Sequence, residues 1–104
     1  MKDLDEYPKI VLPPDFDDQK EYEIPFRGYL GPITVITKDR MEYSVFFVDP
    51  IRLQQELSGE LFFAEVGLIV LHEVTLDAIR VAVRKLDDES FFSQLKPEKP
   101  TLSE

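Results

Sequence analysis

His72 and Glu73 are the residues of this chain whose types come nearest to a catalytic pair. His72 is the only histidine in the sequence, and histidine is the side chain most often used to move protons near neutral pH. A zinc site of the HExxH type needs a second histidine, but Leu76 stands at that position. No serine lies in the G-x-S-x-G setting of a hydrolase nucleophile. His72 and Glu73 are therefore catalytic candidates without supporting partners, which favours a structural histidine.

Carboxylates gather near the N-terminus, where they could bind a hard cation such as calcium. The cluster consists of Asp15, Asp17, Asp18, Glu21 and Glu23. Its spacing does not fit a calcium-binding EF-hand loop, because Lys20 stands where that loop needs glycine and Phe26 stands where it needs a bidentate glutamate. We therefore expect no metal, and we interpret Asp15, Asp17 and Asp18 as part of an interaction surface.

The remaining motifs do not indicate a cofactor. Gly28 and Gly31 are followed by Pro32 and a predicted strand, whereas a dinucleotide-binding loop needs G-x-G-x-x-G between a strand and a helix. There is no cysteine, so thiolate metal sites and disulfides are excluded. We expect no cofactor.

Aromatic residues form three adjacent pairs, Phe46-Phe47, Phe62-Phe63 and Phe91-Phe92. Neighbouring residues of a strand point to opposite faces, so one member of each strand pair must face away from the core of a sheet covered on one side. Phe46 and Phe62 are the members that we assign to an interaction surface. Either the N-terminal segment and Phe91-Phe92 cover them, or a second copy of the chain does, and we lean towards self-association.

The clearest element boundary lies at Val74-Thr75, within the stretch 61–86. Before it the apolar residues run together as in a buried strand, and after it they recur three and four apart as on one face of a helix. Thr75 is a suitable N-cap, and Asp77 complements the helix dipole in the first turn. This boundary predicts a strand that leads into an amphipathic helix.

The other segments complete an α+β pattern. We predict strands over 21–29, 33–38, 43–48, 61–64 and 68–73, helices over 49–59 and 75–86, and a short last helix that begins at Asp87 or Asp88. A polar link over 39–42 predicts a hairpin between the second and third strands. The expected fold is a single α+β domain, with a mostly antiparallel sheet of about four to five strands and two to three helices packed on one face.

Length and composition set the domain boundaries. The chain has 104 residues, 43% of them hydrophobic, which suits one hydrophobic core. Residues 1–19 combine prolines with aspartates and predict an extended acidic arm, and residues 20–95 predict the α+β domain. Residues 96–104 contain two prolines and few apolar side chains, which predicts a mobile tail.

The net charge of −9 is concentrated at the ends of the chain. Residues 1–23 carry eight acids and three bases, residues 87–104 carry five and two, and residues 24–86 carry eight and seven. This distribution disfavours nucleic acids and anionic membranes as ligands, since both bind through clustered Lys and Arg. The acidic ends either attract a basic protein partner or keep the protein in solution. The N-terminus lacks the apolar region of a signal peptide, so we expect a cytoplasmic protein.

The sequence does not define the function, but it favours one class. A near-neutral centre, acidic ends and surplus aromatics are typical of a non-enzymatic protein–protein interaction module, such as an adaptor, an inhibitor or an immunity-type binder. We therefore lean against an enzyme. The alternative is a small enzyme or ligand-binding domain with a pocket near His72 and Glu73.

Overall fold

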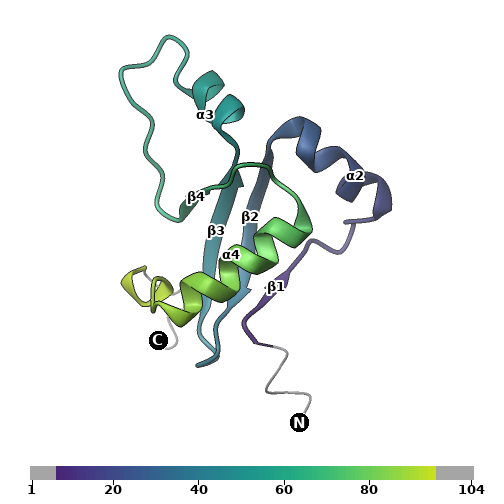
Figure 1. Cartoon of the computed structure of the whole chain (residues 1–104), viewed down its shortest axis with the longest axis vertical. Helices are drawn as coiled ribbons and strands as arrows, with labels where there is room; N and C mark the ends of the chain where they lie inside the picture. Colours follow the sequence, from purple (N-terminus) through teal and green to yellow (C-terminus); the bar gives the residue numbers. More distant parts are fainter. Residues whose placement is uncertain (1–6, 96–104) are drawn as a thin grey trace.

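A mixed four-stranded sheet with helices at one end and across one face forms the fold of this chain (Figure 1). The structure is a computed structural model that describes residues 7–95, so the predicted tail over 96–104 lies outside the described residues. The elements are β1 Lys9–Val11, α2 Asp18–Arg27, β2 Tyr29–Ile36, β3 Glu42–Val48, α3 Pro50–Glu56, β4 Leu68–Val70, α4 Leu76–Asp88 and a 3-10 helix Phe92–Gln94. The predicted α+β class is confirmed.

The strands lie in the order β1-β2-β3-β4. β1 pairs antiparallel with β2, β2 pairs antiparallel with β3, and β4 pairs parallel with β3. The predicted hairpin is confirmed: Ile36 lies opposite Glu42, and the Thr37 N–H donates to the Met41 carbonyl at 3.0 Å. The parallel strand β4 needs a long crossover, which α3 and the connection after it supply. The described part of the predicted arm over 1–19 contributes β1 to the sheet edge and begins α2.

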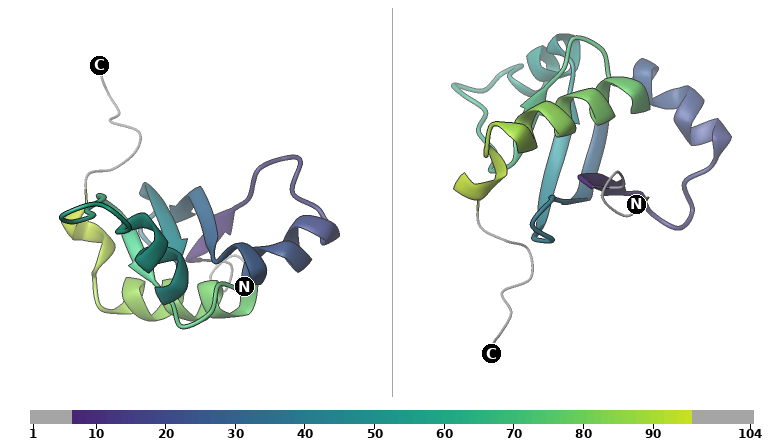
Figure 2. Two further views of the ribbon diagram at one scale, coloured as in Figure 1. Left: turned by 90° about the horizontal axis from the view of Figure 1, so that it is seen from above. Right: turned by 60° about the horizontal axis from the view of Figure 1, so that its bottom comes forward.

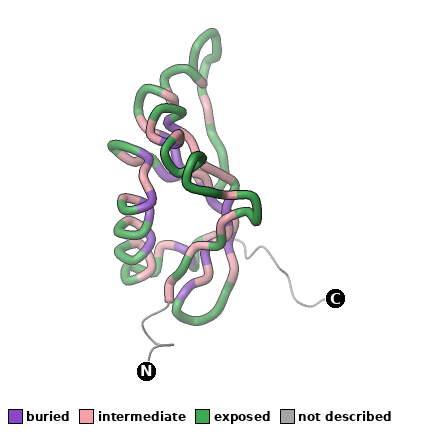
Figure 3. Tube along the Cα trace, turned by 90° about the vertical axis from the view of Figure 1, so that its right-hand side faces the viewer, coloured by how far each residue is buried: buried purple, intermediate pink, exposed green. Residues whose placement is uncertain are grey.

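The core lies between one face of the sheet and α4 (Figure 3). Val35, Val45 and Phe47 share this face and have no exposed surface, while Ile79 and Val83 on α4 are buried against it. α2 and α3 lie at the end of the sheet where β2 begins and β3 ends (Figure 1). Among the described elements, no helix lies on the opposite face of the sheet (Figure 2).

Residues 18–27 form the helix α2, so the predicted strand over 21–29 is wrong. The Asp17 carboxylate accepts a hydrogen bond from the Lys20 N–H at 2.9 Å, and Gly28 ends the helix in the left-handed conformation at φ 67°. These two caps satisfy backbone groups that the helix ends leave unpaired. Pro25 is tolerated because the carbonyl that its missing N–H would pair with belongs to exposed Glu21.

β4 is shorter than predicted, and no strand forms over 61–64. Gly67 allows β4 to approach β3 closely: its φ is 88°, and a Cβ atom there would lie 2.7 Å from the Ser44 carbonyl oxygen. Leu68 then pairs with Phe46, and the ladder ends at Val70 opposite Val48. The chain leaves the sheet at Leu71 to reach α4.

α4 begins as predicted and ends later. The Thr75 hydroxyl accepts a hydrogen bond from the Ala78 N–H at 3.0 Å, which confirms the predicted cap. The short last helix does not begin at Asp87 or Asp88, because α4 continues through both and only Phe92–Gln94 follow as a 3-10 turn. The two aspartates instead bind the hairpin: the Asp87 carboxylate accepts from the Lys38 N–H at 2.9 Å.

Replacing Thr75 tests this cap. Thr75→Ala leaves the N–H group of Ala78 without its acceptor, so we expect the free energy of unfolding to fall by ~1 kcal/mol. Thr75→Ser keeps the hydroxyl and should retain most of that stability. Both values follow from urea titrations, and equal stability of the Ala and Ser variants would show that the cap contributes nothing.

Candidate interaction surfaces

His72 and Glu73 are both exposed in the bend between β4 and α4. Within residues 7–95, His72 has no hydrogen-bond or ion-pair partner, and no three acidic, histidine or cysteine side chains lie close enough to hold a metal ion. His72 does not line the hollow next to this bend, whereas Glu73 does. The two neighbouring residues therefore have different surroundings in the structure.

That hollow, which we call the acidic cleft, is lined by residues of α2 and of the chain that enters α4. Figure 1 shows where these two segments lie. The acidic cleft has a volume of about 570 Å³. It is lined by Asp18, Glu21, Tyr22, Pro25, Phe26, Glu73, Thr75, Leu76 and Asp77. Two elements that are some fifty residues apart in the chain thus contribute four carboxylates and two aromatic rings to one concave surface.

The aromatic rings of the acidic cleft are open to solvent. Tyr22 is 70% exposed and Phe26 is 77% exposed. They lie one helical turn apart on α2, and their ring centroids are 5.5 Å apart in a tilted arrangement. Because large apolar side chains are normally withdrawn from water, a contacting pair of rings at this exposure marks a surface suited to binding.

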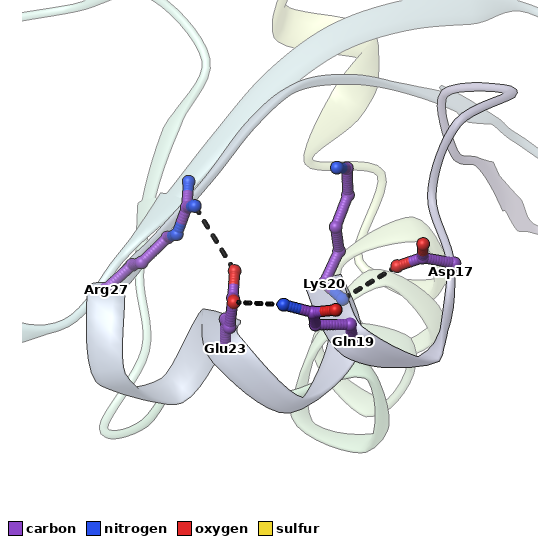
Figure 4. A network of polar contacts seen from close by, with 5 residues as sticks. All are labelled: Asp17, Gln19, Lys20, Glu23 and Arg27. Atoms are coloured by element: carbon purple, nitrogen blue, oxygen red, sulfur yellow. Dashed lines mark hydrogen bonds and ion pairs between the residues drawn. The ribbon is translucent and has the colours of Figure 1, made fainter.

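The carboxylates of the cleft are not neutralised by the protein itself. In the described part of the chain, none of Asp18, Glu21, Glu73 and Asp77 has a side-chain hydrogen bond or an ion pair. The rest of α2 differs, as Figure 4 shows: Glu23 accepts from Arg27 at 3.3 Å and from Gln19 at 3.2 Å. The helix therefore keeps its only arginine on the side away from the cleft.

The three aspartates predicted to act together have different surroundings. Asp17 caps α2, as its bond to the Lys20 N–H in Figure 4 shows. Asp15 is exposed in the preceding turn and borders a second, smaller hollow with Lys20 and Arg27. Asp18 alone reaches the acidic cleft. The sequence signal that could have found the cleft is the four-residue spacing of Tyr22 and Phe26 between the two caps of α2.

A second exposed surface lies on the long connection between α3 and β4, residues 57–67, which we call the apolar loop. It projects beyond the end of the sheet (Figure 1). Leu61 is 93% exposed, Phe62 is 71% exposed and Val66 is 78% exposed. Phe62, predicted to belong to an interaction surface, therefore faces solvent.

Phe46 has a different position from Phe62. It points to the open face of the sheet, while its neighbour Phe47 is fully buried under α4. Phe46 is half-buried and lines a small hollow together with Phe63 and Leu68. The apolar loop thus contributes Phe63 to the same hollow as Phe46. Phe92 is buried in the core, where its ring stacks on Tyr43 at 5.9 Å.

Charges at the end of α4 are paired within the chain. Lys38 Nζ lies 2.7 Å from the Asp88 carboxylate, and this hydrogen bond, with smaller effects from Arg84 and Lys85, lowers the pKa of Asp88. Burial, and then the nearby charges of Asp39 and Asp87, raises the pKa of Tyr43. This end of the helix is therefore held by the hairpin, in contrast to the open acidic end.

Comparisons with protein-family models, with curated proteins and with solved structures found no match for this chain. Among the described helices, none is long and apolar enough to cross a lipid bilayer. Function is therefore inferred from the surfaces themselves.

The aromatic pairs provide a stability test of these positions. Phe47→Ala removes a fully buried ring, so we expect it to lower the free energy of unfolding by roughly 3–5 kcal/mol. Phe62→Ser changes a solvent-exposed ring, and we expect a change within about 0.5 kcal/mol. Chemical denaturation of both variants measures the difference; a large loss for Phe62→Ser would show that the apolar loop packs on the domain.

Proposed function

We propose that this protein is a non-enzymatic interaction module that binds a basic segment of a partner protein in the acidic cleft. The observation that carries this proposal is the combination of two exposed, contacting aromatic rings with four carboxylates that have no cation within the described chain. Lys and Arg side chains suit both features, because they pair with carboxylates and stack on aromatic faces.

The origin of the carboxylates supports this interpretation over one in which acidity serves solubility alone. Asp18 and Glu21 come from the acidic N-terminal part of the sequence, but Glu73 and Asp77 come from its near-neutral centre. Solubility depends on the total charge and does not require carboxylates from distant segments to lie in one hollow. Convergence is instead what electrostatic complementarity to a positive partner requires.

The same features give less support to a reaction. An enzyme needs a nucleophile or an acid–base group that is oriented by a second side chain. His72 has no such partner among the described residues and does not line the cleft. The cleft's other lining groups are aromatic rings, carboxylates, a proline, a leucine and the hydroxyl of Thr75, which caps α4. These groups suit the binding of a partner better than the catalysis of a reaction.

A synthetic peptide tests the proposal without a known partner. We expect a fluorescent peptide that alternates Arg and Leu to bind the wild-type protein in a salt-dependent manner. The double variant Asp18→Asn/Glu73→Gln should weaken this binding by roughly tenfold, because it removes one carboxylate from each side of the cleft, a loss of ~1.4 kcal/mol. Fluorescence anisotropy gives both affinities.

The matched control is Asp15→Asn/Glu60→Gln, which changes the net charge by the same amount at exposed positions outside the cleft. It should bind the peptide as the wild type does. If both double variants lose affinity equally, the peptide recognises only the overall negative charge, and the cleft is not the site. Tyr22→Ala should also weaken binding if the rings take part.

A further inference from the structure

The outer face of α4 is a second charged surface, continuous with the acidic cleft. α4 forms an outer layer of the molecule, and no other described element covers its outward side (Figure 2). A shallow groove runs along this side, lined by Asp77, Arg80, Val81, Arg84, Lys85 and Asp88. Asp77 lines both the groove and the cleft. The two hollows therefore form one strip, acidic where α4 begins and basic further along the helix.

The basic part of this strip contains two arginines without a direct ion pair. Arg80 and Arg84 have no hydrogen bond or ion pair within residues 7–95. They are four residues apart on the same side of the helix, a spacing at which like charges repel. Lys85 and Asp88 differ, because Lys85 lies 3.4 Å from Glu89 and Asp88 is paired with Lys38. Arg84 acts on Asp88 without a direct pair, and it helps to lower the pKa of that carboxyl group. The strip thus presents two arginines without a direct ion pair next to the unpaired carboxylates of the cleft.

The apolar residue of this face lies between the two charged groups. Val81 is 69% exposed, although most of the apolar residues of α4 point into the core. Asp77, Val81 and Arg84 follow the spacing i, i+4, i+7 and therefore form one line along the helix. Asp77 and Arg84 are placed almost symmetrically on either side of Val81. Such a line is complementary to itself when a second copy runs in the opposite direction.

We propose that two copies of this chain associate through the outer faces of their α4 helices, antiparallel about a two-fold axis near Val81. Asp77 of each copy then faces Arg84 of the other, and the two Val81 side chains meet at the axis. A two-fold contact makes each charge pair twice, as closed symmetric dimers do. Antiparallel alignment also brings each helix's positive N-terminal end towards the negative C-terminal end of the other.

The second copy is favoured as occupant because its charges match in both directions. A partner that is only basic would satisfy the acidic end of the strip but would be repelled by Arg80 and Arg84. The helix is 13 residues long, which corresponds to about 20 Å, so the contact is small. Small interfaces form weak complexes, and the dimer should therefore depend strongly on protein concentration.

Sedimentation equilibrium over ~10 μM to ~1 mM protein tests the proposal. We expect the wild type to shift from monomer to dimer across this range. Asp77→Lys and Arg84→Glu each place like charges opposite one another twice, so each variant alone should stay monomeric. In an equimolar mixture of the two, the introduced lysine of the first variant faces the introduced glutamate of the second, and the unchanged pair also forms. The mixture should therefore regain association as a heterodimer.

Glu60→Lys is the matched control, since it makes the same charge change as Asp77→Lys on the apolar loop. It should dimerise as the wild type does, and circular dichroism should show that all the variants are folded. The proposal is overturned if the wild type stays monomeric at the highest concentration, if either single variant still dimerises, or if the mixture fails to regain association. Misfolding cannot explain regained association, because the mixture contains only the two variants that stay monomeric when each is measured alone.

This inference and the proposed function fail separately. The dimer test contains no peptide, and the peptide test is run on dilute, monomeric protein. Arg84 does not line the acidic cleft, so Arg84→Glu should bind the Arg–Leu peptide at least as well as the wild type does while it loses self-association. Loss of peptide binding in that variant would instead show that the peptide lies along α4.

Discussion

The packing of α4 across the central strands is the contact on which the rest of this structure depends. The chain has no cysteine and no described metal cluster within residues 7–95, so its core must come from apolar packing. Ile79 and Val83 of α4 close the face that Val35, Val45 and Phe47 present. With one layer of helix on one layer of sheet, the described helices leave the outer side of α4 and much of the far side of the sheet uncovered.

This constraint explains why the candidate interaction surfaces lie where they do. The bend at 71–75 has to carry the chain from the sheet edge to the start of α4, and it brings Glu73 and Asp77 beside α2. The cap at Thr75 fixes where the helix begins, and so it fixes the position of Asp77. At the other end of α4, the hydrogen bond from the Lys38 N–H to Asp87 holds the helix against the hairpin. The open beginning of α4 and its end held by the hairpin both follow from the same helix placement.

The sequence predicted the parts of the fold that local chemistry controls. Thr75 and the hairpin at 39–42 carry strong local signals, and both form as expected. α2 was mistaken for a strand because Pro25 and the alternation of Tyr22, Ile24 and Phe26 imitate an edge strand. The competing signals, a capping aspartate and a closing glycine at the two ends of the helix, determined the outcome.

The acidic cleft could not be predicted from the sequence, because a sum of charges over sequence segments does not show which charges lie together in the fold. Counted that way, acidity belongs to the ends and the centre is neutral. In the folded structure, Glu73 and Asp77 line the acidic cleft together with Asp18 and Glu21. Arg80 and Arg84 lie one and two turns further along α4. The near-neutral sum over residues 24–86 therefore hides a local separation of Glu73 and Asp77 from Arg80 and Arg84. A local separation of this kind is a property of the helix placement, and it puts opposite charges on one outer surface of a strongly acidic protein.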